Sequence, residues 1–359
     1  NTCARGVAGG LCADTYNWKD MSGQGVGHTG VPSAAVPTTL DWMRLARDHQ
    51  SMPLLTANTR GIGPLASSGW CRFYYTDISL ETVRALAADW VRYVNFILPN
   101  YREGDIPPPG DQAILDSINW YGRPKLLSPG EESTPRVTYW EIGNEPEVAL
   151  PWCTDGAPKF PYSPEEYGIR YKQITQAMLA VDPTIKVGPC ITTANNGNAY
   201  LDAVLSDPTN KVDFVAYHPY GPLYSYANTL GDTPETAEKA LRYVKTQLHE
   251  YHDAIVSRIV ANERDPSAIA LMASEWNASN WLWECSPQIR RMSHAIGVAE
   301  TLFTFTELGL LAANYWSHPA WCGDGTETPG YKVFEMAQAT WGDKLVDSYS
   351  DGYNLRVYT

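Results

Sequence analysis

Short apolar segments alternate with longer amphipathic segments along most of the chain. β-branched and apolar residues concentrate in six stretches that predict strands, at 53–58, 136–142, 185–189, 212–217, 268–275 and 309–316, and a seventh strand is expected within 2–7. Between the strands, apolar residues recur at three- and four-residue steps, which predicts helices at 80–97, 164–181, 236–261 and 288–308. This alternation is typical of βα units and a parallel sheet.

The number of strands decides which architecture we expect. A chain of 359 residues is long enough for one α/β barrel of the (β/α)8 TIM type. Seven strands are visible, so the barrel either lacks its first strand or has it upstream of this sequence. We assign residues 1–342 to a catalytic barrel. Because Ser350-Asp351-Gly352 is a turn signal between two short strands, residues 343–359 are expected to form a C-terminal β-hairpin extension, the start of an incomplete β-sandwich.

Composition narrows the class of partner. The chain is 44% hydrophobic and 19% charged, and no apolar run approaches the ~20 residues of a membrane span, so we expect a globular protein with no membrane partner. A formal net charge of −13 argues against nucleic acid as a partner. The 13 Trp and 22 Tyr beside 7 Phe suit surfaces that stack on sugar rings, although core packing explains any single one equally well. The oligomeric state stays open.

The 7 cysteines carry no metal signature. None lies in a CxxC pair and the histidines do not accompany them at zinc spacing, so neither a metal nor another cofactor is expected. Cys285 and Cys322 fall in neighbouring strand-end loops and are the first choice for a disulfide. With one or two disulfides, the protein is expected to be exported, that is, secreted or extracytoplasmic.

Polar residues at the ends of predicted strands are the candidates for chemistry, because reacting groups of a parallel barrel collect at the carboxyl ends of its strands. One strand ends in Asn144-Glu145-Pro146, where the proline stops the strand from continuing. Another ends in Ser274-Glu275-Trp276-Asn277, and a glutamate directly after a buried strand costs desolvation unless it is used or paired. A solvated loop carboxylate remains the plain alternative for the first motif.

A third strand, between these two in chain order, ends in Tyr217-His218-Pro219-Tyr220. A single His is as often a hydrogen-bonded core residue as a functional one. Two carboxylates on different strands of one barrel are what retaining glycoside cleavage requires, with Glu145 as general acid/base and Glu275 as nucleophile. Tyr220 is then placed to hydrogen-bond the nucleophile, and Asn144 to hold a sugar hydroxyl.

These motifs resemble a known group of enzymes. The stretches 141–146, 218–220 and 274–277 are similar to the strand-four, strand-six and strand-seven signatures of the clan A retaining glycoside hydrolases, nearest the α-L-arabinofuranosidase, β-xylosidase and β-glucuronidase group. Residues 9–20, 53–59 and 312–316 resemble the second, third and eighth strands of that group. The resemblance implies a barrel and these substrate-binding residues: Asn58, Asn144, His218, Tyr220, Trp276 and Trp316, with Trp316 as the floor of the sugar subsite.

The sequence predicts a carbohydrate substrate, with hydrolysis of plant-type polysaccharide or oligosaccharide by double displacement, hemicellulose or β-glucan first. A non-catalytic sugar-binding barrel and a transglycosylase are the alternatives. Loop tryptophans are expected to line the cleft in about half of the cases: Trp70, Trp152, Trp281, Trp283 and Trp321. Two departures from the group, the missing first strand and Leu11 where a small polar residue is common, leave the sugar, the linkage and endo or exo action open.

Overall fold

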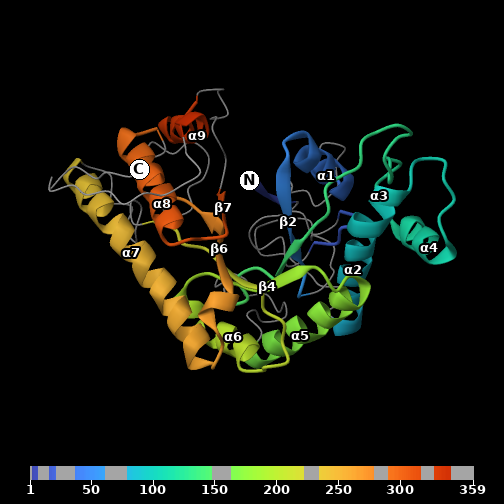
Figure 1. The fold of residues 1–359 in the computed structure, drawn as a ribbon, viewed down its shortest axis with the longest axis horizontal. Helices are drawn as coiled ribbons and strands as arrows, with labels where there is room; N and C mark the ends of the chain where they lie inside the picture. Colours follow the sequence, from blue (N-terminus) through green and yellow to red (C-terminus); the bar gives the residue numbers. More distant parts are fainter. Residues whose placement is uncertain are drawn as a thin grey trace, which may run out of the picture. The chain divides into compact units, whose positions relative to one another are not determined.

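A computed structural model describes residues 2–6, 16–21, 37–60, 79–147, 163–221, 234–278, 290–316 and 327–340 (Figure 1). The expected hairpin at 343–359, the five loop tryptophans and the Cys285–Cys322 pair lie outside these residues. None of the described helices combines the length and the apolar composition that crossing a bilayer takes.

All seven expected strands are present, with bounds that differ by a few residues from the predicted ones. They are β1 (Thr2–Gly6), β2 (Ser51–Ala57), β3 (Tyr139–Ile142), β4 (Lys186–Ile191), β5 (Phe214–Tyr217), β6 (Ala270–Trp276) and β7 (Ala312–Tyr315). They form one sheet in the order β1-β2-β3-β4-β5-β6-β7. The pairs β1-β2, β2-β3, β3-β4 and β6-β7 are parallel. The α/β fold with a parallel sheet is confirmed, whereas closure into an eight-stranded barrel stays a prediction.

The four expected helices are also present, together with helices that periodicity did not reveal. The major helices are α1 (Thr39–Asp48), α2 (Leu80–Arg92), α4 (Pro109–Ser117), α5 (Pro164–Val181), α6 (Ala194–Leu205), α7 (Pro234–Ala261), α8 (Met292–Glu307) and α9 (Pro329–Thr340). Short turns complete the set: η3 (Tyr93–Ile97), α3 (Leu98–Asn100) and η5 (Pro266–Ala268). The apolar periodicity gave no bounds for α1, α4, α6 and α9. The signal for α1 is its capping box, in which Thr38 and Asp41 bond each other's backbone.

The chain divides into two compact units. The first comprises residues 1–216 and 258–270, and the second comprises 217–257 and 271–359. Each unit is described by itself. In the first, α2 packs against α5, and α5 against α6; in the second, α8 packs against α9 (Figure 1).

Aromatic residues form much of the core of the first unit. Trp18 stacks on Trp90 with ring centroids 6.0 Å apart, and the edge of Trp90 meets Trp140 at 5.6 Å. Trp18 donates from Nε1 to the Leu86 carbonyl, so the polar tip of the buried indole is satisfied. The many Trp and Tyr residues of this chain therefore serve core packing to a large extent, which was the plainer of the two explanations of the composition.

A π-helical turn adjoins this core. The turn η3 carries Asn95, which is 8% exposed. Asn95 donates from Nδ2 to the Val137 carbonyl (3.0 Å) and to the Asp182 carboxylate (2.9 Å), and its Oδ1 accepts the Val137 N–H (2.8 Å). One side chain thus fixes the backbone that leads into β3.

Replacing this side chain tests how much β3 depends on it. The Asn95→Leu variant leaves the N–H of Val137 buried without its acceptor and removes one of two donors from its C=O, which keeps only Trp140 Nε1 at 3.3 Å, so we expect the free energy of unfolding to fall by about 3 kcal/mol in urea titrations. The matched control is Asn100→Leu, because Asn100 is exposed and bonds only the last turn of its own helix. A loss of equal size in both variants would contradict the role of Asn95.

Candidate active site

The end of β3 leaves the strand conformation abruptly. Gly143 has φ +77°, and its N–H donates to the Ala57 carbonyl at 2.9 Å. A Cβ added to Gly143 would lie 3.0 Å from Thr59 Oγ1. Both the positive φ and this close approach favour glycine at position 143. Glu145 follows with φ +46°, the left-handed region that a side chain other than glycine enters only at a cost of about 1 kcal/mol or more. Such strain is concentrated at functional sites.

Buried polar side chains just after the end of β2 hold the Glu145 backbone in this conformation. The Arg60 guanidinium donates to the Glu145 carbonyl at 3.0 Å, and Arg60 is only 4% exposed. The backbone N–H of Arg60 in turn donates to Asn58 Oδ1 at 2.9 Å, while Asn58 Nδ2 donates to the Tyr16 carbonyl at 3.3 Å. Asn58, expected to bind substrate, uses both ends of its amide to fix neighbouring backbone. Arg60 was not predicted as a site residue, since its signal in the sequence is that of a charged residue close to the end of a buried strand.

Two further residues flank Glu145. Asn144 is fully buried at the end of β3, as expected of a residue next to the reacting group, but its contact with a sugar stays a prediction. Glu147 accepts at Oε1 from the backbone N–H of Thr192 (2.5 Å) and from its hydroxyl (2.7 Å). Burial raises the pKa of Glu147, and the nearby charge of Glu145 adds to this. This second carboxylate was not identified from the sequence.

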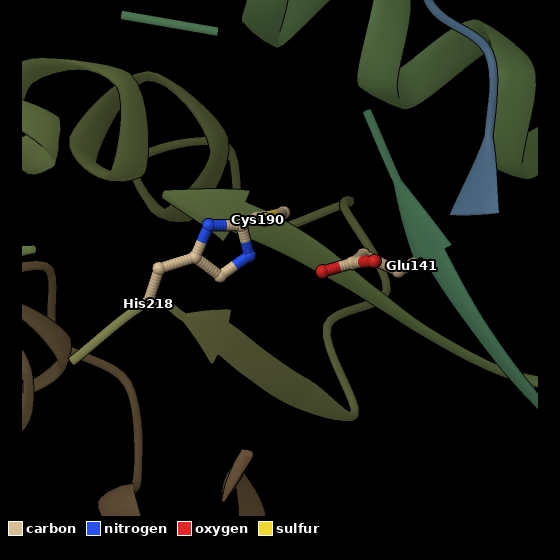
Figure 2. A group of neighbouring side chains, drawn as sticks. All are labelled: Glu141, Cys190 and His218. Atoms are coloured by element: carbon tan, nitrogen blue, oxygen red, sulfur yellow. The ribbon is translucent and has the colours of Figure 1, made fainter. Parts of the chain in front are cut away.

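A carboxylate and a thiol lie on the neighbouring strands β3 and β4 of the first unit. Glu141 on β3 is fully buried and accepts a hydrogen bond of 2.7 Å from Thr56 Oγ1. Cys190 on β4 is buried and forms no disulfide with another described residue (Figure 2). The expectation of a metal-free site stays a prediction. Figure 2 also labels His218, which belongs to the second unit.

In the second unit, β6 contains a bulge at the candidate nucleophile. Ala273 pairs with Ala313, but Trp276 pairs with Tyr315, so the two residues 274 and 275 oppose one residue of β7. A bulge of this kind changes where the side chains of a strand point and is common next to active sites. Glu275, which is 3% exposed, lies at this bulge.

The carboxylate of Glu275 has two partners from the end of β5. Tyr220 donates its hydroxyl to Glu275 Oε2 at 2.9 Å, which confirms the expected hydrogen bond. Nδ1 of His218 lies 3.6 Å from the same oxygen, and its Nε2 lies 3.2 Å from Ser274 Oγ. The ring of His218, which is 1% exposed, thus contacts both residues of the bulge, Ser274 and Glu275.

The two tryptophans expected to bind substrate have different environments. Trp276 is fully buried; its ring meets Phe305 edge-on at 5.3 Å and Tyr315 at 5.0 Å, in a core shared with α7 and α8. Trp276 therefore packs in the core of the second unit, and its contact with a sugar stays a prediction. Trp316 is half-buried, and its backbone N–H donates to the Trp276 carbonyl at 2.7 Å. Its contact with a sugar stays a prediction.

Comparisons with known proteins define the structural class. No family model matches the chain. The structural neighbours are glycoside hydrolases, namely family 51 α-L-arabinofuranosidases of clan A and enzymes of family 44. The resemblance to the arabinofuranosidase group is thus confirmed. At the identities given below, a structural likeness shows the fold alone.

Particular relatives give the extent of the match. The family 51 α-L-arabinofuranosidase of Bifidobacterium longum has a TM-score of 0.62 at 17% identity, over 94% of this chain and 63% of its own. The Thermotoga maritima α-L-arabinofuranosidase has 0.55 at 21%, over 96% and 62%. The family 44 xyloglucanase of Paenibacillus polymyxa has 0.57 at 12%, over 94% and 72%.

One curated protein adds a match in sequence. It is an intracellular exo-α-(1→5)-L-arabinofuranosidase of Halalkalibacterium halodurans, 24% identical over 193 residues. The match covers 52% of this chain and 35% of that protein. The aligned part is therefore about a third of the length of the relative.

The buried His294 on α8 makes stability depend on pH. Desolvation lowers its pKa to about 4, so the native state binds fewer protons than the unfolded chain between pH 4 and 6.5. The stability that the neutral ring contributes is complete above pH 6.5 and is lost as pH falls to about 4, a change of about 3 kcal/mol. We expect His294→Gln to lack this part of the pH dependence in urea titrations. The control His252→Gln, on the outer side of α7, should keep the wild-type slope; identical slopes in all three proteins would contradict the assignment.

Proposed function

We propose that this chain is a retaining glycoside hydrolase that cleaves plant-type polysaccharide or oligosaccharide by double displacement. Glu275 is the nucleophile and Glu145 is the general acid/base. The observation that carries the proposal is the Glu275 carboxylate, buried at a bulge and bonded at 2.9 Å by the Tyr220 hydroxyl. A buried carboxylate whose orientation is fixed by a hydroxyl donor is suited to act as a nucleophile.

The mechanism assigns a proton and a bond to each glutamate. In the first step Glu275 attacks the anomeric carbon, while protonated Glu145 gives its proton to the leaving glycosidic oxygen. In the second step Glu145 takes a proton from water, and the water releases the sugar from Glu275 with net retention. The chemistry requires the two carboxyl groups to lie roughly 5–5.5 Å apart. Asn144 and Trp316 are proposed to hold the sugar.

The fold supports this assignment through its strand ends. Glu145 follows β3 and Glu275 is the penultimate residue of β6, and in parallel α/β folds the reacting groups gather at the carboxyl ends of strands. We propose that the seven strands belong to a (β/α)8 barrel like that of the clan A enzymes. A purely sugar-binding barrel is not favoured, because a binding site gains little from a buried, pre-oriented carboxylate.

For the substrate, α-L-arabinofuranoside is the first candidate. The names of the Bifidobacterium, Thermotoga and Halalkalibacterium relatives support it, whereas the family 44 xyloglucanase makes β-glucan or xyloglucan the second. A screen of 4-nitrophenyl α-L-arabinofuranoside, β-xyloside, β-glucoside and β-glucuronide, with xylan and xyloglucan alongside, separates them. Adding an acceptor sugar and analysing products by mass spectrometry distinguishes hydrolysis from transglycosylation.

Removing either glutamate tests the catalytic assignment. We expect Glu275→Gln and Glu145→Ala to lower kcat by about 10³-fold or more, with unfolding temperatures close to wild type. Azide should restore part of the rate of Glu145→Ala, because a small anion can attack the glycosyl-enzyme without a general base. The azide product should keep the anomeric configuration of the substrate. Full activity in either variant, or an inverted product, would refute the proposal.

The Tyr220 hydroxyl is tested separately. A hydrogen bond to a charged group contributes about 1.5–3 kcal/mol, so Tyr220→Phe should lower kcat/KM by about 10- to 100-fold. The matched control is Tyr243→Phe, because the Tyr243 hydroxyl bonds Glu250 on the exposed side of α7 in the same unit. Equal kcat/KM values for the two variants would show that the Tyr220 hydroxyl has no role in the reaction.

A further inference from the structure

Asn277, two residues after Glu275, joins three segments of the second unit. Its Nδ2 donates to the Trp316 carbonyl at 2.7 Å, after the end of β7. Its own backbone carbonyl accepts the Gly221 N–H at 2.8 Å, after the end of β5. Its Oδ1 lies 2.8 Å from Nε2 of His294 on α8. Asn277 is 1% exposed and His294 is 2% exposed, so these contacts are shielded from water.

The contacts define the proton positions in this network. Only the Nδ2 end of the Asn277 amide can donate to the Trp316 carbonyl, so the end facing His294 is the oxygen. His294 must then donate from Nε2, which leaves Nδ1 as the bare nitrogen of a neutral ring. A Cβ at Gly330 of α9 would lie 3.4 Å from this Nδ1. A protonated ring would have a buried N–H at Nδ1 with no partner in the described part of the chain, which agrees with the lowered pKa.

The same network fixes the geometry around the candidate nucleophile. Gly221 directly follows Tyr220, the donor to Glu275, and a Cβ at Gly221 would lie 2.2 Å from the Ala278 carbonyl. The backbones after β5 and β6 are therefore in direct contact at this point. A shift of Asn277 would therefore displace Glu275 through the chain of β6, and would displace Tyr220 through the hydrogen bond to Gly221.

We infer that His294 and Asn277 are positioning residues. Through the contacts of Asn277 with Trp316, Gly221 and His294, they hold the Tyr220 hydroxyl and the Glu275 carboxylate at hydrogen-bond distance from each other. This inference rests on the proposed function. His294 contacts no reacting group and acts through Asn277, so its effect is on the placement of the nucleophile rather than on proton transfer.

A pair of amide substitutions at one position tests the inference. In His294→Gln the amide nitrogen lies near the position of Nε2 and can still donate to Asn277, whereas in His294→Asn it lies near Nδ1 and cannot. Two measurements compare these variants with wild type and with His252→Gln. One is amide hydrogen exchange at Gly221, whose N–H bonds the Asn277 carbonyl, with the α5 segment as internal reference. The other is kcat and KM on the 4-nitrophenyl glycoside that wild type hydrolyses fastest.

The expected outcome is a difference between the two amides. His294→Asn should exchange at Gly221 at least about tenfold faster than wild type and lose at least about tenfold in kcat, with KM within about twofold. His294→Gln should stay within about threefold in both. If His294→Asn does not fold, Asn277→Asp replaces it, since it keeps the acceptor for His294 and loses the donor to Trp316.

Other outcomes overturn one proposal or the other. Equal exchange at Gly221 in both amide variants would overturn the positioning role, whatever their rates. Faster exchange in His294→Asn with unchanged kcat would reduce the network to a purely structural one. A wild-type protein inactive on every glycoside would refute the proposed function. The exchange data would still decide whether His294 and Asn277 protect the Gly221 N–H from exchange.

Discussion

Ser274 and Glu275 together oppose one residue of β7, so β6 has one extra residue at this point. This bulge determines which side chains of β6 enter the core of the second unit. In a regular strand side chains alternate, so Ala273 and Glu275 would share a face and Trp276 would point to the other. With the bulge, Ala273 and Trp276 both enter the core beside α8, and Glu275 meets Tyr220 and His218 instead. The largest aromatic side chain of the strand and its buried carboxylate are thereby separated.

Buried carboxylates recur at the strand ends, and each has its own donors. Thr56 bonds Glu141, Thr192 bonds Glu147 and Tyr220 bonds Glu275. Hydroxyl donors satisfy a carboxylate without adding a positive charge. By contrast, the charged pairs of the structure lie largely at the periphery, as for Arg44 and Glu131.

Local signals made the strands and the longest helices predictable, whereas long-range contacts did not leave such a signal. The helix α6 contains Asn-Asn-Gly-Asn, a poor helix sequence, yet a Cβ at Gly197 would lie 2.6 Å from Ile191 Cβ, so packing requires this glycine. The glutamates were recognisable because each follows an apolar run. Arg60 and His294 were not, since each acts on a residue far from it in sequence. The packing role of Trp276 was missed for the same reason: the pattern of residues does not reveal an extra residue in a strand.

The left-handed backbone at Glu145 separates the demands of folding from those of chemistry. Glycine or asparagine would occupy this conformation at lower cost, so the fold alone would select against glutamate there. A lineage selected only for thermal endurance would be expected to replace this residue early and to gain stability by doing so. Glutamate at position 145 thus has a cost in stability that a residue suited to folding alone would not have.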